Sequence, residues 1–415
     1  MLNSIKWYFY LLLFAPIIGL ISYNISIEYY AFHALSYLVL PVFLIFLLTR
    51  KNKIYIPGFL YFYIAYVLHI YVWKIYNGYY EANGLIKYLF SNYHIYALLL
   101  MIIIYNTNIS PKTYKSFVKL IKITLLIALV GVLIQFFIPN WMTRPTGWEV
   151  AIGNIFIDRR SSIFTYVSDN EYGISILAFF SLIFSIQLFR KNIRWLILFS
   201  IIIGLYSVLT NTRYIMIGFI LVLFQSLFDK DKSKKISSIL YFAIVFGVIY
   251  YLLTDVLGVD LKQLGEQRLF HEDSIKETSR YGAYINFLQF FPEKPVFGTG
   301  VHLTDEIRAA SQAIFSSQIH VGYLSHLVSY GLFGSFLLFS FWFGLARDLY
   351  RKAKLTKHYG SLFAFLVFLW FNVTAVNFKL MYMGLIFAFI FSQYYHRHYI
   401  FQAKLQQDQL HKNLY

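Results

Sequence analysis

The stretch "VGYLSHLVSYGLFGSFLLFSFWFGLA" (residues 321–346) contains no Asp, Glu, Lys or Arg. At 1.5 Å rise per residue, an apolar run of about 20 residues forms a helix that crosses a ~30 Å hydrocarbon core. The run therefore predicts a transmembrane helix. The next stretch, "RDLYRKAKLTK" (347–357), is strongly basic, which is typical of a cytoplasmic loop. We therefore expect the helix to begin at the outer face, directly after His320.

The same apolar character continues through the whole chain. Hydrophobic residues make up 59% of the sequence and charged residues only 13%, against about 25% charged residues in ordinary soluble domains. We predict an all-α, polytopic membrane protein in which residues 1–415 form a single domain with about 12 transmembrane helices. The predicted spans are 7–23, 30–48, 56–73, 93–105, 119–138, 171–189, 195–209, 214–228, 238–256, 321–346, 361–377 and 380–395.

The distribution of charge gives an orientation. With the N-terminus inside, the inside segments hold 23 Lys and Arg and 4 Asp and Glu, whereas the outside segments hold 13 and 15. This asymmetry follows the positive-inside rule, so we expect both termini in the cytoplasm. The net charge of +17 is then explained by topology, and we expect no nucleic-acid partner. No cysteine is present to staple an outer loop.

The two largest outside segments are residues 139–170 and 257–320. In the second, "SIKE" (274–277) is a capping box that predicts a helix over 275–291. "TDEIRAASQAIFSSQI" (304–319) begins with a Thr cap and predicts another amphipathic helix. We expect the large extracytoplasmic loop 257–320 to be partly helical and to cover the outer mouth of the bundle.

Three arginines on the predicted outer side are candidates for a site. Arg213 ends "TNTR" (210–213) after a short span, so it is either a cation that snorkels to water or one that faces a polar cavity. Arg280 lies early in the predicted loop helix, and Arg160 precedes the sixth span. Each of these two, by itself, is explained more simply by a solvated surface than by a site.

Two histidines stand near the start of the tenth predicted span. His320 is either an interfacial histidine with a local hydrogen bond or a functional group at the mouth of the bundle. His326 lies deeper, and we interpret it as a core histidine. The glycines that follow, Gly322, Gly331 and Gly334, are expected to let neighbouring helices approach closely.

Taken together, three stretches resemble a known family. "TNTRYIMIGFI" (210–220), "SRYGAYINFLQFFPEKPVFGTG" (279–300) and "IHVGYLSHLVSYGLFG" (319–334) follow one another in that order. The chain resembles the O-antigen polymerase and O-antigen ligase superfamily over about residues 155–345. It departs from the family in two places, because Val321 replaces the asparagine that often follows the histidine, and "RRSSIFTYVSDN" (159–170) replaces an R-x-x-G and Pro-Asn pattern.

The resemblance implies glycan transfer from a polyprenyl diphosphate to a sugar hydroxyl. By motif position it implies that Arg213 and Arg280, and less closely Arg160, bind the diphosphate, and that His320 is catalytic. The chemistry agrees, because guanidinium groups suit a diphosphate and stabilise it as a leaving group. Histidine has a pKa suited to accepting a proton from a hydroxyl near neutral pH. We expect no cofactor and no metal.

The expected function is that of a polymerase of lipid-linked repeat units at the outer face of the bacterial cytoplasmic membrane. The product would be a capsule, an exopolysaccharide or an O-antigen, and the expected partners are membrane lipid, a chain-length regulator and a flippase. A ligase that transfers glycan to another acceptor remains an alternative. A lipid-linked glycan flippase or transporter is a further one, although it would need charges along many spans, whereas here Lys122 and Lys379 lie near span ends.

Overall fold

In the part of the chain that it describes, the computed structural model is helical apart from connecting segments and one short hairpin. In the hairpin, β1 (Ala151–Ile152) pairs antiparallel with β2 (Ile155–Phe156). The all-α prediction is therefore confirmed for the part of the chain that the structure describes. The described residues are 7–11, 38–49, 53–76, 93–137, 151–152, 155–156, 169–210, 213–228, 232–259, 279–300, 321–374, 380 and 382–414.

Each of the twelve predicted spans overlaps a described helical segment, although only residues 7–11 of the first span are described. One further helix, α13, belongs to the large loop. The elements are α3 (Val39–Thr49), α4 (Gly58–Tyr76), α6 (Tyr93–Asn106), α7 (Pro111–Phe137), α8 (Asp169–Phe189), α9 (Ile193–Leu209), α10 (Arg213–Leu223), η2 (Phe224–Phe228), α11 (Lys232–Tyr251), η3 (Leu252–Val256), α13 (Ser279–Phe290), η5 (Phe291–Glu293), α15 (Gly322–Thr356), α16 (Gly360–Thr374) and α17 (Met383–Leu414).

Two of these helices are long and apolar enough to cross a membrane, Pro111–Ile134 within α7 and Gly322–Thr356, which is α15. The other apolar helices in the described ranges have 10–17 residues. A straight helix needs about 20 residues to span the hydrocarbon core. The membrane character of the bundle is therefore supported, and the count of twelve spans stays a prediction.

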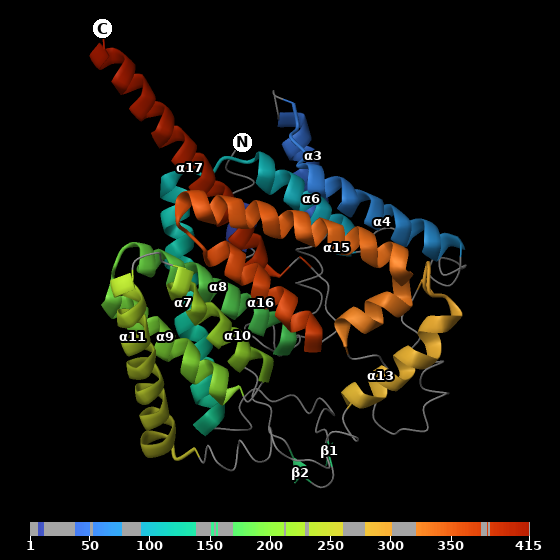
Figure 1. Cartoon of the computed structure of the whole chain (residues 1–415), viewed down its shortest axis with the longest axis horizontal. Coiled ribbons are helices and arrows are strands. Elements are labelled where there is room, and N and C mark those ends of the chain that lie inside the picture. The colour runs from blue at the N-terminus through green and yellow to red at the C-terminus, as the bar shows by residue number, and fades with distance from the viewer. Residues whose placement is uncertain are drawn as a thin grey trace.

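Helix α8 forms the centre of the bundle. Residues 173–187 are buried along their whole length, and the helix packs against α7, α9, α10, α16 and α17. A helix that is apolar on every face is stable only when other apolar surfaces surround it. Figure 1 shows α8 between these neighbours, with α15 and α4 lying side by side across one end of the bundle.

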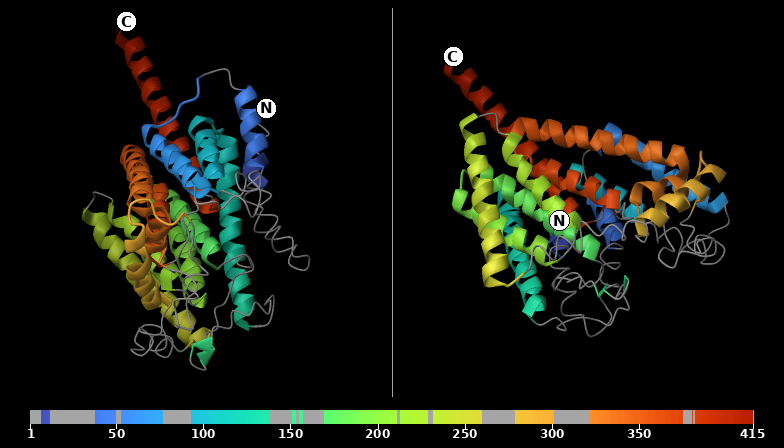
Figure 2. Two further views of the ribbon diagram at one scale, coloured as in Figure 1. Left: turned by 90° about the vertical axis from the view of Figure 1, so that its right-hand side faces the viewer. Right: turned by 60° about the horizontal axis from the view of Figure 1, so that its bottom comes forward.

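The C-terminal tail and the β1–β2 hairpin lie at opposite ends of the molecule. Helix α17 is buried over 383–393 and exposed from residue 398 to 407, and its last turns extend away from the bundle (Figures 1 and 2). The β1–β2 hairpin, from the segment predicted outside, lies at the opposite end of the molecule. The tail and this segment therefore lie at opposite ends, as the orientation requires, while the sidedness itself stays a prediction.

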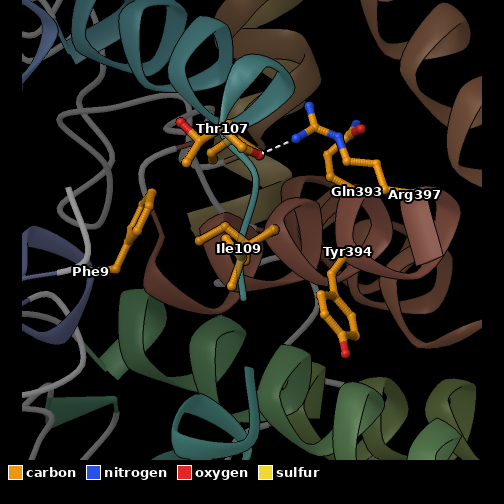
Figure 3. A pocket seen from close by; sticks show the side chains of 8 residues that line it. Phe9, Thr107, Ile109, Gln393, Tyr394 and Arg397 are labelled. Atoms are coloured by element: carbon orange, nitrogen blue, oxygen red, sulfur yellow. Dashed lines mark hydrogen bonds between the residues drawn. The ribbon is translucent and has the colours of Figure 1, made fainter. Parts of the chain in front are cut away.

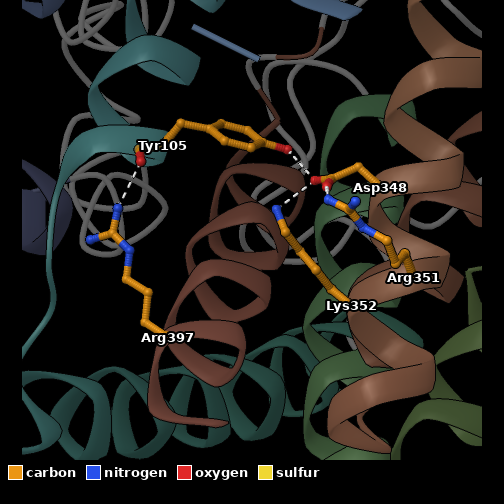
Figure 4. A network of polar contacts seen from close by, with 5 residues as sticks. All are labelled: Tyr105, Asp348, Arg351, Lys352 and Arg397. Atoms are coloured by element: carbon orange, nitrogen blue, oxygen red, sulfur yellow. Dashed lines mark hydrogen bonds and ion pairs between the residues drawn. The ribbon is translucent and has the colours of Figure 1, made fainter. Parts of the chain in front are cut away.

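A polar network joins α6, α15 and α17 near the predicted cytoplasmic end (Figure 4). Tyr105 Oη donates to Asp348 Oδ2 at 2.8 Å, and Lys352 Nζ lies 2.5 Å from the same oxygen. Arg397 of α17 donates to the main-chain oxygens of Tyr105 and Thr107. Since buried charges are costly unless they are paired and hydrogen-bonded, this network fixes the three helices relative to one another.

Candidate active site

Helix α15 is broken at Gly331, whose φ of 66° and ψ of −170° are not helical. In an uninterrupted helix, Leu332 N–H would donate to Val328 and Phe333 N–H to Ser329. Here the Val328 and Ser329 oxygens instead accept hydrogen bonds from a separate segment. That segment is residues 294–300, which we call the inserted loop.

The inserted loop satisfies both sides of the break. Thr299 N–H donates to the Val328 oxygen at 2.9 Å, and Gly300 N–H donates to the Ser329 oxygen at 2.7 Å. On the other side, Leu332 N–H and Phe333 N–H each donate at 2.9 Å, to the main-chain oxygens of Pro295 and Val296 respectively. Non-helical backbone is tolerated at membrane depth only when protein or water satisfies its polar groups. The inserted loop supplies that satisfaction.

Two glycines make this insertion sterically possible. A Cβ added at Gly331 would lie 2.3 Å from the Val296 oxygen, and one added at Gly298 would lie 2.5 Å from Gly331 N. Both residues also have positive φ, at 66° and 73°. Only glycine avoids both the clash and the strain. The expectation that Gly331 lets a helix approach is therefore corrected, because the close neighbour is the inserted loop.

The large loop contributes helix α13, which confirms the first predicted loop helix with bounds of Ser279–Phe290. The helix packs against the first turns of α15 through a small apolar cluster that includes Ala283, Phe290, Val321 and Val328. Arg280 lies in the first turn of α13, three residues before Ala283. The second predicted loop helix (304–319) lies outside the described residues.

The last turns of α16 connect the start of α10 with the start of α15. The ring of Tyr214, which follows Arg213, packs edge-on against Phe371 at 4.7 Å. Tyr323 Oη donates to the Leu369 oxygen at 2.8 Å. The helix starts of α10 and α15 therefore meet one end of α16, and α13 joins the same group through α15.

These contacts bear on the four predicted site residues in different ways. The backbones of Arg213 and Arg280 begin α10 and α13, and their side chains are outside what the structure describes. His320 and Arg160 also lie outside the described residues. Val321, which follows His320, is buried in the cluster with α13. The structure thus links the starts of α10, α13 and α15 through α15 and α16. The roles of the four residues stay predictions.

His326 is buried with 2% of its surface exposed. Its ring lies 4.9 Å from Tyr330 and 5.5 Å from the ring of Tyr66 on α4. This aromatic packing fits the interpretation of a core histidine.

One residue at this end of the bundle was missed by the sequence analysis. Trp73 of α4 donates its indole N–H to the Gly298 oxygen at 2.9 Å. An aromatic residue at the outer end of a predicted span is common at membrane interfaces, so the sequence offered no signal that separates this tryptophan from an ordinary interfacial one.

A small cavity lies elsewhere, beside Arg397 at the predicted cytoplasmic end (Figure 3). Its volume of about 10 Å³ is enough for a single water molecule at most, so it is no site for a sugar. Within the described ranges, no group of three or more His, Asp or Glu residues could hold a metal ion.

The long apolar helices support a membrane protein. Residues 196–339 match the family model described as O-antigen ligase. The matched span covers about a third of the chain, runs from α9 into α15, and includes the positions of Arg213, Arg280 and His320. This match confirms the resemblance found in the sequence. A comparison with curated proteins found no match.

Proposed function

We propose that the chain polymerises oligosaccharide repeat units carried on a polyprenyl diphosphate, at the outer face of the bacterial cytoplasmic membrane. The observation that carries this proposal is the match to the O-antigen ligase family over residues 196–339. That segment holds Arg213, Arg280 and His320, the cationic and basic groups which such a transfer needs.

In the proposed reaction, the diphosphate of the donor is held by the guanidinium groups of Arg213 and Arg280, with Arg160 as a further contact. His320 accepts the proton of the acceptor hydroxyl. The hydroxyl oxygen forms the new bond to the anomeric carbon, while the bond from that carbon to the diphosphate oxygen breaks. The polyprenyl diphosphate leaves with the bonding electron pair, and the arginines stabilise its developing charge.

The arrangement of the helices supports this division of roles. The first turns of α10 and α13 and the start of α15 are linked through α16 and the apolar cluster around Val321. Groups from separate elements can act on one substrate when rigid packing holds those elements together. A flippase that delivers the repeat unit and a chain-length regulator are the proposed partners.

A ligase is the second candidate function, because the matching family is itself described as O-antigen ligase. The two candidates share the donor and differ in the acceptor. In the ligase, completed glycan passes to another acceptor. In the polymerase, the growing glycan passes to a further lipid-linked repeat unit.

The experiment that separates them uses the purified protein in lipid vesicles with a labelled, lipid-linked repeat unit as the only substrate. The polymerase is expected to give a ladder of glycan lengths. A ligase gives no ladder until a second acceptor is added, and then one discrete product. An absence of glycan transfer under both conditions would contradict the proposed function.

A further inference from the structure

Trp73 joins the N-terminal part of the chain to the inserted loop. It lies on α4, far before the segment that matches the O-antigen ligase family. Its indole nitrogen donates to the main-chain oxygen of Gly298 at 2.9 Å, across 225 residues of sequence. Gly298 lies directly against the break, because a Cβ added at this residue would lie 2.5 Å from Gly331 N. The hydrogen bond therefore ends where the loop enters the break in α15.

Aromatic contacts from His69 and Trp73 of α4 reach both the inserted loop and α15 just after the break. The Trp73 ring lies 5.1 Å from the ring of Phe297 in the inserted loop. His69, one turn earlier, lies 5.3 Å from Phe333, which follows the break in α15. Phe297 and Phe333 also contact each other at 5.8 Å. Helix α4 thus packs against the loop and the helix at the point where their backbones exchange hydrogen bonds.

The inserted loop is the direct connection between α13 and the rest of the large outer loop. Its register against α15 is set by backbone hydrogen bonds to Val328, Ser329, Leu332 and Phe333. Those bonds do not involve α4. The hydrogen bond from Trp73 also ties the inserted loop to α4, and so restricts movement of the loop relative to α15.

We propose that Trp73 is a positioning residue for glycan transfer, acting through the inserted loop. By fixing the Gly298 carbonyl, it holds α13, whose first turn contains Arg280, at a constant distance from the start of α15, which follows His320. This inference rests on the proposed function. A small displacement between groups that bind and activate reactants slows a reaction strongly even when both groups remain present.

The test compares Trp73→Phe, which keeps an aromatic ring and removes the N–H, with Trp195→Phe as a matched control. Trp195 lies on α9, where its ring faces Lys122 of α7. The first readout is amide hydrogen exchange of the inserted loop and of residues 329–333, which needs no substrate. Loss of one net hydrogen bond predicts about tenfold faster exchange in these segments for Trp73→Phe. No change is expected for Trp195→Phe.

The second readout is the rate of glycan transfer. Trp73→Phe is expected to lower kcat about tenfold or more, while KM for the lipid-linked donor changes by less than about threefold. A third variant, Trp73→His, restores a ring N–H and is expected to recover part of both effects. If Trp73 acted only by filling space, the smaller ring of Trp73→His would not restore slow exchange or kcat.

The outcomes are separable. Unchanged exchange in Trp73→Phe would overturn the claim that Trp73 holds the loop. Faster exchange with unchanged kcat would overturn the positioning role. If the wild-type protein transfers no glycan, the proposed function fails and the positioning role falls with it, while the exchange readout still decides whether Trp73 holds the loop.

Discussion

Replacing Gly331 by alanine tests the break in α15 with three matched glycine positions. Gly331 combines positive φ with a Cβ position 2.3 Å from the Val296 oxygen. Gly258 also has positive φ, at 64°, but open space around its Cβ position. Gly247, within α11, has neither the strain nor a neighbour within 4 Å. The three positions therefore separate strain, clash and intrinsic helix propensity.

The expected magnitudes follow from these geometries. At Gly331 the backbone strain costs about 1–3 kcal/mol. Displacing the inserted loop leaves the Leu332 and Phe333 N–H groups without acceptors, at about 1–3 kcal/mol each. The sum is at least about 3 kcal/mol. Gly258→Ala should cost about 1–2 kcal/mol from strain alone, and Gly247→Ala should stabilise by about 0.5–1 kcal/mol.

The assay is the midpoint of unfolding of the detergent-solubilised protein, followed by circular dichroism. The expected order of stability is Gly247→Ala, wild type, Gly258→Ala and then Gly331→Ala. The reasoning would be refuted if Gly331→Ala were as stable as Gly258→Ala, since the inserted loop would then exert no steric constraint at the break.

Three further predictions address topology, the arginines and pH. A cysteine at Ser311 should react with a membrane-impermeant reagent in intact cells or spheroplasts, whereas one at Thr356 should not; the reverse pattern would overturn the orientation. The variants Arg213→Lys and Arg280→Lys should each lose most of the glycan-transfer activity at a normal protein level, because lysine keeps the charge and lacks the planar fork of donors. Full activity in the two lysine variants and in the corresponding alanine variants would show that both arginines are ordinary surface residues. Burial, with a smaller contribution from the charge of Arg190, lowers the pKa of His358 to about 4. Between about pH 6.5 and pH 4 the unfolded chain therefore binds a proton at this histidine that the folded chain does not, so the free energy of unfolding should fall by up to about 3 kcal/mol over this range. The dependence of that free energy on pH should be weaker in His358→Phe, and an equal dependence there would assign the effect to other groups.

The sequence predicted the helices well because apolar runs and charged connections are local signals. The capping box and Pro292 predict a helix over 275–291, and the structure has α13 over Ser279–Phe290. Only residues 7–11 of the first span lie within the described ranges, and the second loop helix (304–319) lies wholly outside them.

The break in α15 could not be predicted in the same way. The run 321–346 predicts one continuous span, whereas the structure interrupts it at Gly331, where φ is positive. The hydrogen bonds that make it tolerable come from residues 294–300, which are adjacent in space rather than in the helix pattern. The contact of Trp73 with Gly298 is equally non-local. Periodicity and spacing carry no information about such pairs.

The candidate site was predicted as a set of residues, and the structure adds how their segments are held. The family match supports the order of the three motifs. The links from α16 to α10 and α15 were not foreseeable, because Tyr214 and Tyr323 read as ordinary aromatic residues of a membrane bundle. The roles of Arg213, Arg280, Arg160 and His320 stay predictions.

The most direct test of the account is glycan length on a gel after His320→Ala, normalised to membrane-inserted protein, with His326→Ala as the comparison. His320→Ala should abolish polymer and leave single repeat units on their lipid carrier, because the acceptor hydroxyl has lost its proton acceptor. His326→Ala should lower protein level more than activity per molecule, since the ring is buried among aromatic side chains. A normal ladder from His320→Ala, or loss of polymer from His326→Ala at normal protein level, would contradict the assignment of His320 as the catalytic residue.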